Sequence, residues 1–426
     1  MYGIAQFVDL GERFRISDTN QPMVNANINT HDDIYMHGKS WKITEFESSP
    51  YLQRSAFNFY SMPLTTKPYG AVSFLDRIKT IFVLLPLPLV TVYRLVAARF
   101  LPCERRKSWK RVLTDTSFRY ISSSLSVNQM QNMMGTTLGV YKEWTKKNGM
   151  PYLVDEIGED ARLMWFGERE TENVILYIHG GVYCLPLQDF AASFWKYAVN
   201  AMKQNTGRKI GFVALNYSLT PTAYFPTQLK QTILALNHLL SLGVRPENIQ
   251  VAGESAGGAL VLQLLSHILH PVPDLPLLPK DIKLGGACIM SPWVSLTGNT
   301  GSHLENSDSD VLPAETWAYL GEHTLPALSD ASRPYLQAID APEGWFKGVD
   351  RHVRRVLVTV GERECLRDDV LKVARKLETA TDDAFLSVFV HVNGVHNDQY
   401  LDFMAGEKQL GDLTPQLIGW LEKGLH

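Results

Sequence analysis

Residues 249–262 read IQVAGESAGGALVL, and this stretch decides how the rest of the 426-residue chain is interpreted. A short apolar run leads into Gly-Glu-Ser-Ala-Gly-Gly, and a second apolar run follows. A G-x-S-x-G pentapeptide between a strand and a helix places its serine on a tight, strained turn. The N-terminus of the helix behind that turn favours negative charge that develops beside the serine. We therefore interpret Ser255 as a nucleophile, the alternative being a structural strand–helix turn.

A second glycine-rich turn precedes this serine in the chain. The apolar run 174–178 ends in His179-Gly180-Gly181, and Val182 follows. Acyl transfer needs backbone N–H groups that point to the place where the oxyanion forms, and glycines allow a loop to bend inward for this. His-Gly-Gly alone could belong to any turn, but together with the downstream serine turn it indicates acyl-transfer chemistry.

The two turns together resemble the hormone-sensitive-lipase-like family of α/β hydrolases. That family includes arylacetamide deacetylases, fungal steryl acetyl hydrolases and bacterial carboxylesterases. Two further runs, 215–226 and 291–297, look like the family's turn before a helix and its post-strand loop. The resemblance covers about residues 151–426 and includes no motif of the first 150 residues.

The resemblance implies an oxyanion hole. Its donors would be the backbone N–H groups of Gly181, Val182 and Ala256, with Gly180 shaping the turn. The family usually has a third glycine where this chain has Val182, and we expect the valine to narrow the acyl pocket without abolishing the hole. His179 would orient the loop rather than act as a base.

The resemblance also implies the acid and the base, which follow the serine in the order Asp/Glu, then His. After the predicted strand 356–360, Glu364 matches the position of the triad acid, where aspartate is commoner. Asp368 is the rival, and its other role would be to cap a nearby helix. Of two histidines near the last predicted strand, His391 continues the strand, whereas His396 lies in the following loop and matches the family's histidine.

These residues predict a serine hydrolase that cleaves carboxylic esters. His396 would take the proton of Ser255, Glu364 would hold the imidazole, and water would release the acid, with no metal and no organic cofactor. The expected substrate is a small lipophilic ester, such as an ester of a sterol or a natural product. The alternatives are a biosynthetic enzyme of the same fold that carries out acyl transfer or cyclisation/condensation, and a non-catalytic binding module.

The pattern from residue 151 onward predicts an α/β-hydrolase fold, with a mostly parallel central sheet flanked by helices, because short β-branched runs alternate with helical stretches. The predicted strands are 174–178, 210–216, 249–252, 286–290, 356–360 and 386–390. The predicted helices are 128–146, 226–242 and 256–268. The first of these carries a methionine-rich stripe, typical of core packing, that could also line an adaptable pocket.

The composition of the chain changes along its length and predicts four parts. These are an irregular N-terminal extension (1–70), an apolar segment with a basic flank (71–115), a cap helix region (116–150) and the catalytic domain (151–426). Within the catalytic domain, residues 296–342 are too long for a simple loop and predict an inserted lid.

Residues 80–93 carry no charge, but they are shorter than the roughly 20 residues of a spanning helix. Extension to residue 101 adds Arg94 and Arg99, and Pro86 and Pro88 would kink a helix. Three interpretations stay open: a short or kinked membrane span, an interfacial or re-entrant anchor, and a buried segment that caps a lipophilic pocket.

The flank of this segment is basic, because residues 94–111 hold seven basic residues and one acidic residue. Such a flank attracts anionic lipid head groups, so residues 80–111 predict contact with a membrane surface. The first residues lack the basic start and apolar run of a secretory signal peptide. We expect a membrane-associated protein, for example at the endoplasmic reticulum, or a cytoplasmic one.

The composition is that of a globular protein, with 45% hydrophobic and 20% charged residues. A net charge of −3 excludes a dedicated nucleic-acid binder, which would need a large basic excess. The four cysteines, at positions 103, 184, 288 and 365, show no metal-binding spacing and predict free thiols. The sequence sets no expectation for the oligomeric state.

Overall fold

The computed structural model describes residues 67–101, 104, 107–298, 301–379 and 385–426, and five short strands before them. Those strands are β1 (Val8–Asp9), β2 (Arg15–Ile16), β3 (Val24–Asn25), β4 (Asp33–Met36) and β5 (Lys39–Lys42). The prediction of an irregular extension over 1–70 falls mostly outside the described residues, as does Cys103.

One sheet of nine strands forms the centre of the molecule, in the order β1-β13-β12-β11-β10-β8-β9-β7-β6. Its parallel strands are β8 (Val174–Ile178), β9 (Gly211–Asn216), β10 (Ile249–Glu254), β11 (Gly286–Met290), β12 (Val356–Gly361) and β13 (Leu386–His391). All six predicted strands are confirmed. The sequence interpretation missed the antiparallel edge pair β6 (Leu153–Gly158) and β7 (Ala161–Trp165).

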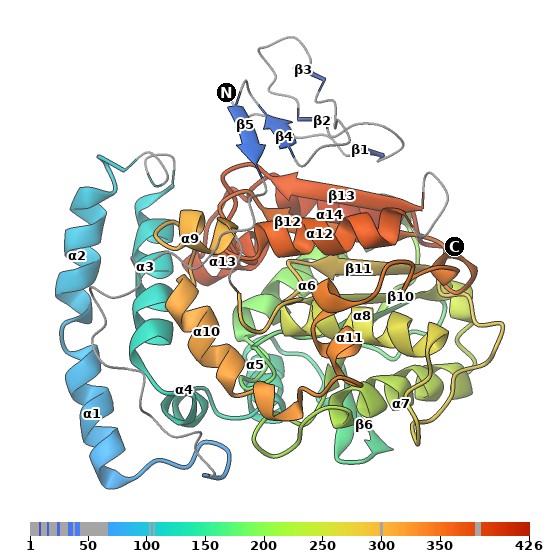
Figure 1. Cartoon of the computed structure of the whole chain (residues 1–426). Coiled ribbons are helices and arrows are strands. Elements are labelled where there is room, and N and C mark those ends of the chain that lie inside the picture. Colours follow the sequence, from blue (N-terminus) through green and yellow to red (C-terminus); the bar gives the residue numbers. More distant parts are fainter. Residues whose placement is uncertain are drawn as a thin grey trace.

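The strands alternate between two apolar clusters, one on each face of the sheet. Leu176 of β8 belongs to the cluster that contains α7 (Thr227–Ser241), whereas Tyr177 belongs to the other. The first cluster also includes α8 (Ala256–Leu269) and α12 (Arg367–Glu378). The second includes α6 (Asp189–Thr206) and α14 (Leu413–Glu422). Helices therefore cover both faces, as an α/β-hydrolase fold requires (Figure 1).

The predicted single helix over 128–146 is wrong, because two helices occupy this stretch. These are α4 (Val127–Met134) and α5 (Thr137–Lys147). Gly135 adopts a φ of 76° that ends α4, and the Thr136 side chain then accepts the Gly139 N–H and starts α5. The break separates the methionines of α4 from the aromatic residues of α5.

The predicted lid region, 296–342, consists of short helical pieces. They are α9 (Gly301–Asn306), η3 (Leu325–Ala327), α10 (Ala314–Glu322), α11 (Arg333–Leu336) and η4 (Ala338–Asp340). Trp317 and Leu320 of α10 are buried. Two further short turns, η2 (Pro246–Asn248) and η5 (Val349–Arg351), lie outside this region.

Two helices, α1 (Phe74–Leu84) and α2 (Leu87–Ala97), stand end to end beside α3 (Trp109–Ser124) and form what we call the α1–α2 rod (Figure 1). Pro86 and Pro88 lie in the first turn of α2, where a missing N–H costs no hydrogen bond. Neither helix contains a buried residue. The interpretation of residues 80–101 as a buried segment is therefore wrong.

Arg111 joins α3 to α13 (Asp398–Ala405) through a buried ion cluster. Its guanidinium lies 3.1 Å from Asp115, 2.6 Å from Asp398 and 2.5 Å from Asp402. Burial opposes ionisation of Asp398, but the charge of Arg111 outweighs it and lowers the pKa of Asp398 to about 2. The cluster fixes α3 to α13, which follows the last strand of the central sheet.

This cluster also changes the interpretation of the basic flank. Arg94 pairs with Glu104 at 2.6 Å, and Lys107 pairs with Asp115 at 2.6 Å. Arg105 and Arg106 lie outside the described residues. Three of the seven basic residues that the sequence suggested for lipid head groups, Arg94, Lys107 and Arg111, are thus paired with carboxylates within the fold.

We expect Arg111→Met to lower the free energy of unfolding by about 3–5 kcal/mol at neutral pH, because Asp398 and Asp402 stay buried without their guanidinium partner, whereas Asp115 keeps Lys107. The stabilisation by Asp398 is present above the unfolded pKa of about 4 and is lost as the pH falls toward about 2, so the difference between variant and wild type shrinks in that range. Urea unfolding at several pH values measures this. Arg99→Met, at an exposed arginine after α2, is the control. Equal losses in both variants would contradict the prediction.

Candidate active site

Ser255 occupies the turn between β10 and α8 with φ 53° and ψ −120°, a strained conformation for a residue with a side chain. It is 3% exposed. A Cβ at Gly253 would lie 2.4 Å from the Gly257 carbonyl oxygen, and one at Gly257 would lie 2.0 Å from the Ile178 carbonyl oxygen. Both neighbours must therefore be glycine, and the motif is a requirement of backbone packing.

Glu364 and His396 form a buried pair at the carboxyl ends of β12 and β13. Glu364 Oε1 lies 2.7 Å from His396 Nδ1. The other carboxylate oxygen accepts hydrogen bonds from Ser291 Oγ at 2.8 Å and from the Gly361 N–H at 2.9 Å. Glu364 is thus held in one orientation by three donors.

Ser255 and His396 line the same cavity. Within the described residues they form no hydrogen bond with each other, and His396 Nε2 lies 3.0 Å from Asn397 Nδ2. Catalytic hydrogen bonds often tighten only when substrate is bound. Trp317 of the lid region packs edge-on against the His396 ring, with centroids 4.9 Å apart.

The two rival residues lie elsewhere. Asp368 accepts the Ser302 N–H at 2.9 Å, at the start of α9, and pairs with Arg367 at 2.8 Å. His391 ends β13 and lies 3.3 Å from Asp398. Neither side chain lines the cavity that Ser255 and His396 share.

The loop after β8 passes close to the nucleophile. A Cβ at Gly180 would lie 3.0 Å from Ser255 Cβ. The loop then bends through positive φ at Gly181 (102°) and Val182 (50°). Among the described residues, no backbone hydrogen bond uses the N–H of Gly181 or of Val182. Ala256 is the first residue of α8 and is buried. Gly181 and Val182 line the same cavity as Ser255, and Ala256 directly follows the serine in the chain.

Glu254 is the residue of this site that the sequence interpretation missed. Its Oε1 accepts the Gly180 N–H at 2.6 Å, so it ties the loop after β8 to the serine turn. Tyr400 Oη lies 3.5 Å from the other oxygen. Burial raises the pKa of Glu254 to about 8, so the protonated form of the carboxyl is favoured far more than in water. The sequence did carry a signal for this role, since Glu254 is an acid at the second position of G-x-S-x-G, next to the serine.

His179 supports the same loop. Its Nδ1 lies 2.7 Å from the Gly180 carbonyl oxygen, and its ring stacks on Tyr217 with centroids 4.5 Å apart. Burial lowers the pKa of His179 to about 4, so the ring is neutral. It is placed to orient the loop.

The cavity above Ser255 has a volume of about 250 Å³ and mostly apolar walls. Met130, Met133 and Met134 of α4 contribute to one wall, and Leu320 of the lid region and Met404 of α13 contribute to others. Methionine walls adapt to ligands of different shape. Within the part of the chain that the structure describes, no group of His, Cys, Asp or Glu side chains could hold a metal ion.

Comparison with known proteins agrees with this geometry. Residues 175–396 match the family described as alpha/beta hydrolase fold. A Schizosaccharomyces pombe protein whose name proposes a steryl acetyl hydrolase is 26% identical over 72% of this chain and 84% of its own length. Neutral cholesterol ester hydrolase 1 of Bos taurus is 24% identical over 76% of this chain and 95% of its own length.

The fold also matches solved structures. The crystal structure of an esterase from the bacterial hormone-sensitive lipase family superposes with a TM-score of 0.56 at 20% identity, over 75% of this chain and 99% of that one. This likeness concerns the fold.

We expect Glu254→Ala to slow phosphonylation of Ser255 by a fluorophosphonate about 10²-fold, because the loop that carries the oxyanion donors loses its anchor. Glu254→Gln keeps an acceptor for the Gly180 N–H and should react within a few-fold of wild type. Time courses of labelling, with unfolding curves as the control for folding, measure this. Equal rates for the Ala variant and wild type would rule out the anchoring role.

Proposed function

Because the chain belongs to the hormone-sensitive-lipase-like family of α/β hydrolases, we propose that it is a serine carboxylic ester hydrolase with Ser255 as nucleophile, His396 as base and Glu364 as acid. The observation that carries the proposal is the 2.7 Å contact of Glu364 with His396 beside the cavity that holds Ser255. The order of the three residues along the chain is that of this fold.

The reaction proceeds through an acyl-enzyme. His396 Nε2 exchanges its contact with Asn397 for one with Ser255 and takes the hydroxyl proton as Oγ attacks the ester carbonyl. The N–H groups of Gly181, Val182 and Ala256 hold the oxyanion. The alcohol leaves with the proton from His396, and a water, deprotonated by His396, releases the carboxylic acid and frees Ser255.

Glu364 supports the base in this scheme. It orients the ring through Nδ1–H and stabilises the imidazolium that forms. Its second oxygen is already occupied by Ser291 and Gly361, so the carboxylate cannot rotate away. A glutamate in place of aspartate adds one methylene, and these two donors fix the longer side chain.

The substrate we propose is a lipophilic ester with a short acyl group. The apolar cavity supports a lipophilic alcohol part, and the relatives are named for steryl acetyl and cholesterol ester hydrolysis. The side chain of Val182 lies in the oxyanion loop and lines the cavity, so it reduces the room on the acyl side.

A second candidate reaction is acyl transfer to an alcohol, or a cyclisation/condensation of the same acyl-enzyme. Ser255 and His396 are both buried, and a site that excludes water favours an alcohol as the acceptor. The amount of free carboxylic acid formed per acyl group consumed, with and without added alcohol, distinguishes transfer from hydrolysis.

We expect Ser255→Ala to abolish turnover of short-chain p-nitrophenyl esters and fluorophosphonate labelling. Glu364→Gln should lower kcat by about 10²–10⁴-fold, because the imidazolium loses its partner. Asp368→Asn is the matched control, since it removes a carboxylate four residues away and should keep kcat near wild type. If Glu364→Gln kept full activity and Asp368→Asn lost it, Asp368 would be the triad acid and Glu364 would not.

We further propose that the α1–α2 rod contacts a membrane surface. Within the described residues it is the one helical run long and apolar enough to cross a membrane by length and composition. Its large apolar side chains that point outward are 59–75% exposed: Phe74, Leu75, Ile81, Phe82, Leu85, Leu89, Val92, Tyr93 and Val96. Arg77, Lys79 and Arg99 are exposed as well, and suit anionic head groups.

The contacts of the rod favour a position in the plane of the membrane over a span. Gln129 of α4 donates to the Asp76 carbonyl at 3.1 Å and to Thr80 at 2.9 Å. Tyr120 of α3 donates to the Val83 carbonyl at 2.8 Å. A spanning rod would have to break these bonds or carry charged helices into the hydrocarbon, which is costly.

This position would bring the bilayer close to the cavity. Tyr120 of α3 donates a hydrogen bond to the rod, while Phe118 and Ile121 of the same helix line the cavity. A lipophilic ester dissolved in the bilayer would therefore be separated from Ser255 by the thickness of one helix.

We expect the triple variant Phe82→Asp, Leu85→Asp and Leu89→Asp to lose binding to vesicles that contain an anionic lipid, because charge replaces the apolar face that inserts. Leu277→Asp is the control, since Leu277 is 66% exposed but lies outside the rod. Co-sedimentation measures binding. Fluorophores on cysteines placed at positions 74, 85 and 96 should be quenched equally by brominated lipids. Deepest quenching at position 85 would indicate a span.

A further inference from the structure

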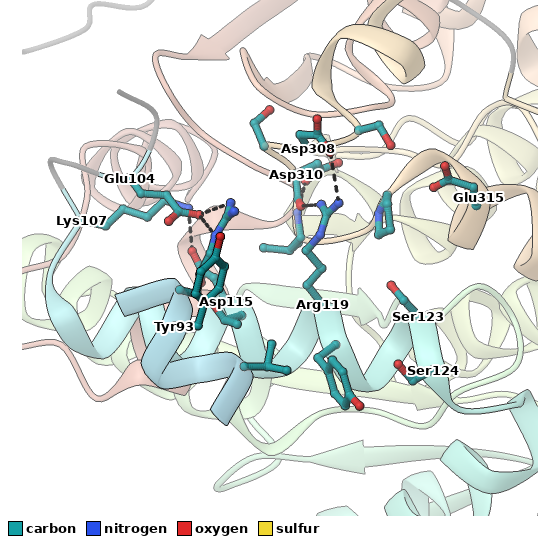
Figure 2. A pocket seen from close by; sticks show the side chains of 18 residues that line it. Tyr93, Glu104, Lys107, Asp115, Arg119, Ser123, Ser124, Asp308, Asp310 and Glu315 are labelled. Carbon is teal, nitrogen blue, oxygen red and sulfur yellow. Dashed lines mark hydrogen bonds and ion pairs between the residues drawn. The ribbon is translucent and has the colours of Figure 1, made fainter. Parts of the chain in front are cut away.

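A short segment of the lid region lies between the triad and a polar pocket beside α3. Residues 307–311 line this pocket on one side, and Arg119 and Ser123 of α3 line it on the other (Figure 2). Two aspartates of the segment differ sharply in environment. The side chain of Asp308 is fully exposed, whereas Asp310 is 2% exposed. Burial of a carboxylate needs compensation, so the partners of Asp310 are informative.

The Asp310 carboxylate accepts hydrogen bonds from the backbone of two loops, one that carries Glu364 and one that carries His396. Its Oδ1 accepts the N–H of His396 at 2.8 Å, and the N–H of Val311 at 2.8 Å. Its Oδ2 accepts the N–H of Cys365 at 2.8 Å, and Cys365 directly follows Glu364. One side chain therefore connects the loop after β12, which carries the acid, to the loop after β13, which carries the base.

The backbone of Asp310 is fixed from two further sides. Its N–H donates to the Asn306 carbonyl at 2.9 Å, and Asn306 Nδ2 donates to the Glu364 carbonyl at 2.9 Å. Arg119 Nη1 donates to the Asp310 carbonyl at 2.5 Å. Figure 2 shows Arg119 extending from α3 toward Asp308 and Asp310. The segment is thus hydrogen-bonded to α3 on one side and connected through Asn306 to the loop after β12 on the other.

The charged and titratable groups that face Asp310 are Glu364, His396, Cys365 and Arg119. Burial and the Glu364 carboxylate raise the pKa of Asp310. The charge of His396 and the backbone N–H groups of Cys365 and His396 oppose that rise. A second carboxylate near the imidazole favours its charged form, which arises when the base takes the serine proton.

We infer that Asp310 is a positioning residue that holds the Glu364 loop and the His396 loop in register and adds negative charge beside the imidazole. The inference rests on the proposed function of this site. It adds a fourth group to the three of the triad, supplied by the lid region, so that packing of the lid and alignment of the triad depend on each other.

The test compares Asp310→Asn with Asp308→Asn, because both remove one carboxylate from the same segment and only the first side chain reaches the triad. Rates on a p-nitrophenyl ester are normalised to the concentration of Ser255 that a fluorophosphonate titrates. We expect Asp310→Asn to lower kcat by up to about a hundredfold with KM nearly unchanged, because small displacements of the base cost that much. Asp308→Asn should match wild type.

The pH profile separates positioning from a purely structural role. Loss of the Asp310 charge removes a negative charge that favours the protonated form of the base, so the acid limb of kcat/KM should move to lower pH. Asp310→Glu keeps the charge but displaces it, so its kcat should fall while the acid limb stays near that of wild type. This second variant keeps the test decisive if Asp310→Asn does not fold.

Two results would overturn the inference. One is a wild-type kcat and pH profile in Asp310→Asn. The other is an Asp310→Asn protein with less Ser255 that a fluorophosphonate can titrate, but with the wild-type kcat per titrated site and the wild-type acid limb, which would indicate a purely structural role. Ser255→Ala is measured in parallel. Turnover that survives in Ser255→Ala would refute the proposed function itself, whereas an inactive Ser255→Ala with a normal Asp310→Asn would refute the role of Asp310 alone.

Discussion

The close approach of two backbones, at Gly257 of α8 and Ile178 of β8, is the constraint on which the candidate site depends. A side chain at Gly257 would overlap the Ile178 carbonyl oxygen, so the helix can begin there only because the residue is glycine. This contact places the first turn of α8 against the end of β8. It forces Ser255 into its strained turn, and it brings the loop after β8 beside that serine. The strained turn at Ser255 and the loop beside it therefore depend on the same packing contact.

Buried acids hold the loops that surround this centre. Glu254 accepts the N–H of Gly180, and Asp310 accepts the N–H groups of His396 and Cys365. Glu364 likewise accepts from Gly361. A loop near a reaction centre has backbone donors that no strand or helix satisfies, and a buried carboxyl group can satisfy several of them at once. The site obtains rigid loops in this way.

Much of the fold could be predicted because parallel strands have a strong local signature. The strands β8, β10, β11 and β12 are buried along their whole length, and such strands read as continuous β-branched runs. The helix expected over 128–146 failed because its apolar periodicity continues through Gly135, whose positive φ ends a helix. The hairpin of β6 and β7 was missed because it lies at the edge of the sheet, where the pattern is weaker. Glu364 and His396 could be placed by motif order, whereas Asp310 carries no local signal.

The sequence by itself determined the parallel strands and the serine turn, because each depends on neighbours within a few positions of the chain. Only the tertiary structure decided three other matters. These are the internal pairing of part of the basic flank, the outward direction of the apolar α1–α2 rod, and the joining of the acid and base loops by Asp310. The paired charges range from 8 positions apart, as for Lys107 and Asp115, to 291 positions apart, as for Arg111 and Asp402. No local pattern specifies such contacts, since the packing of whole elements brings them together.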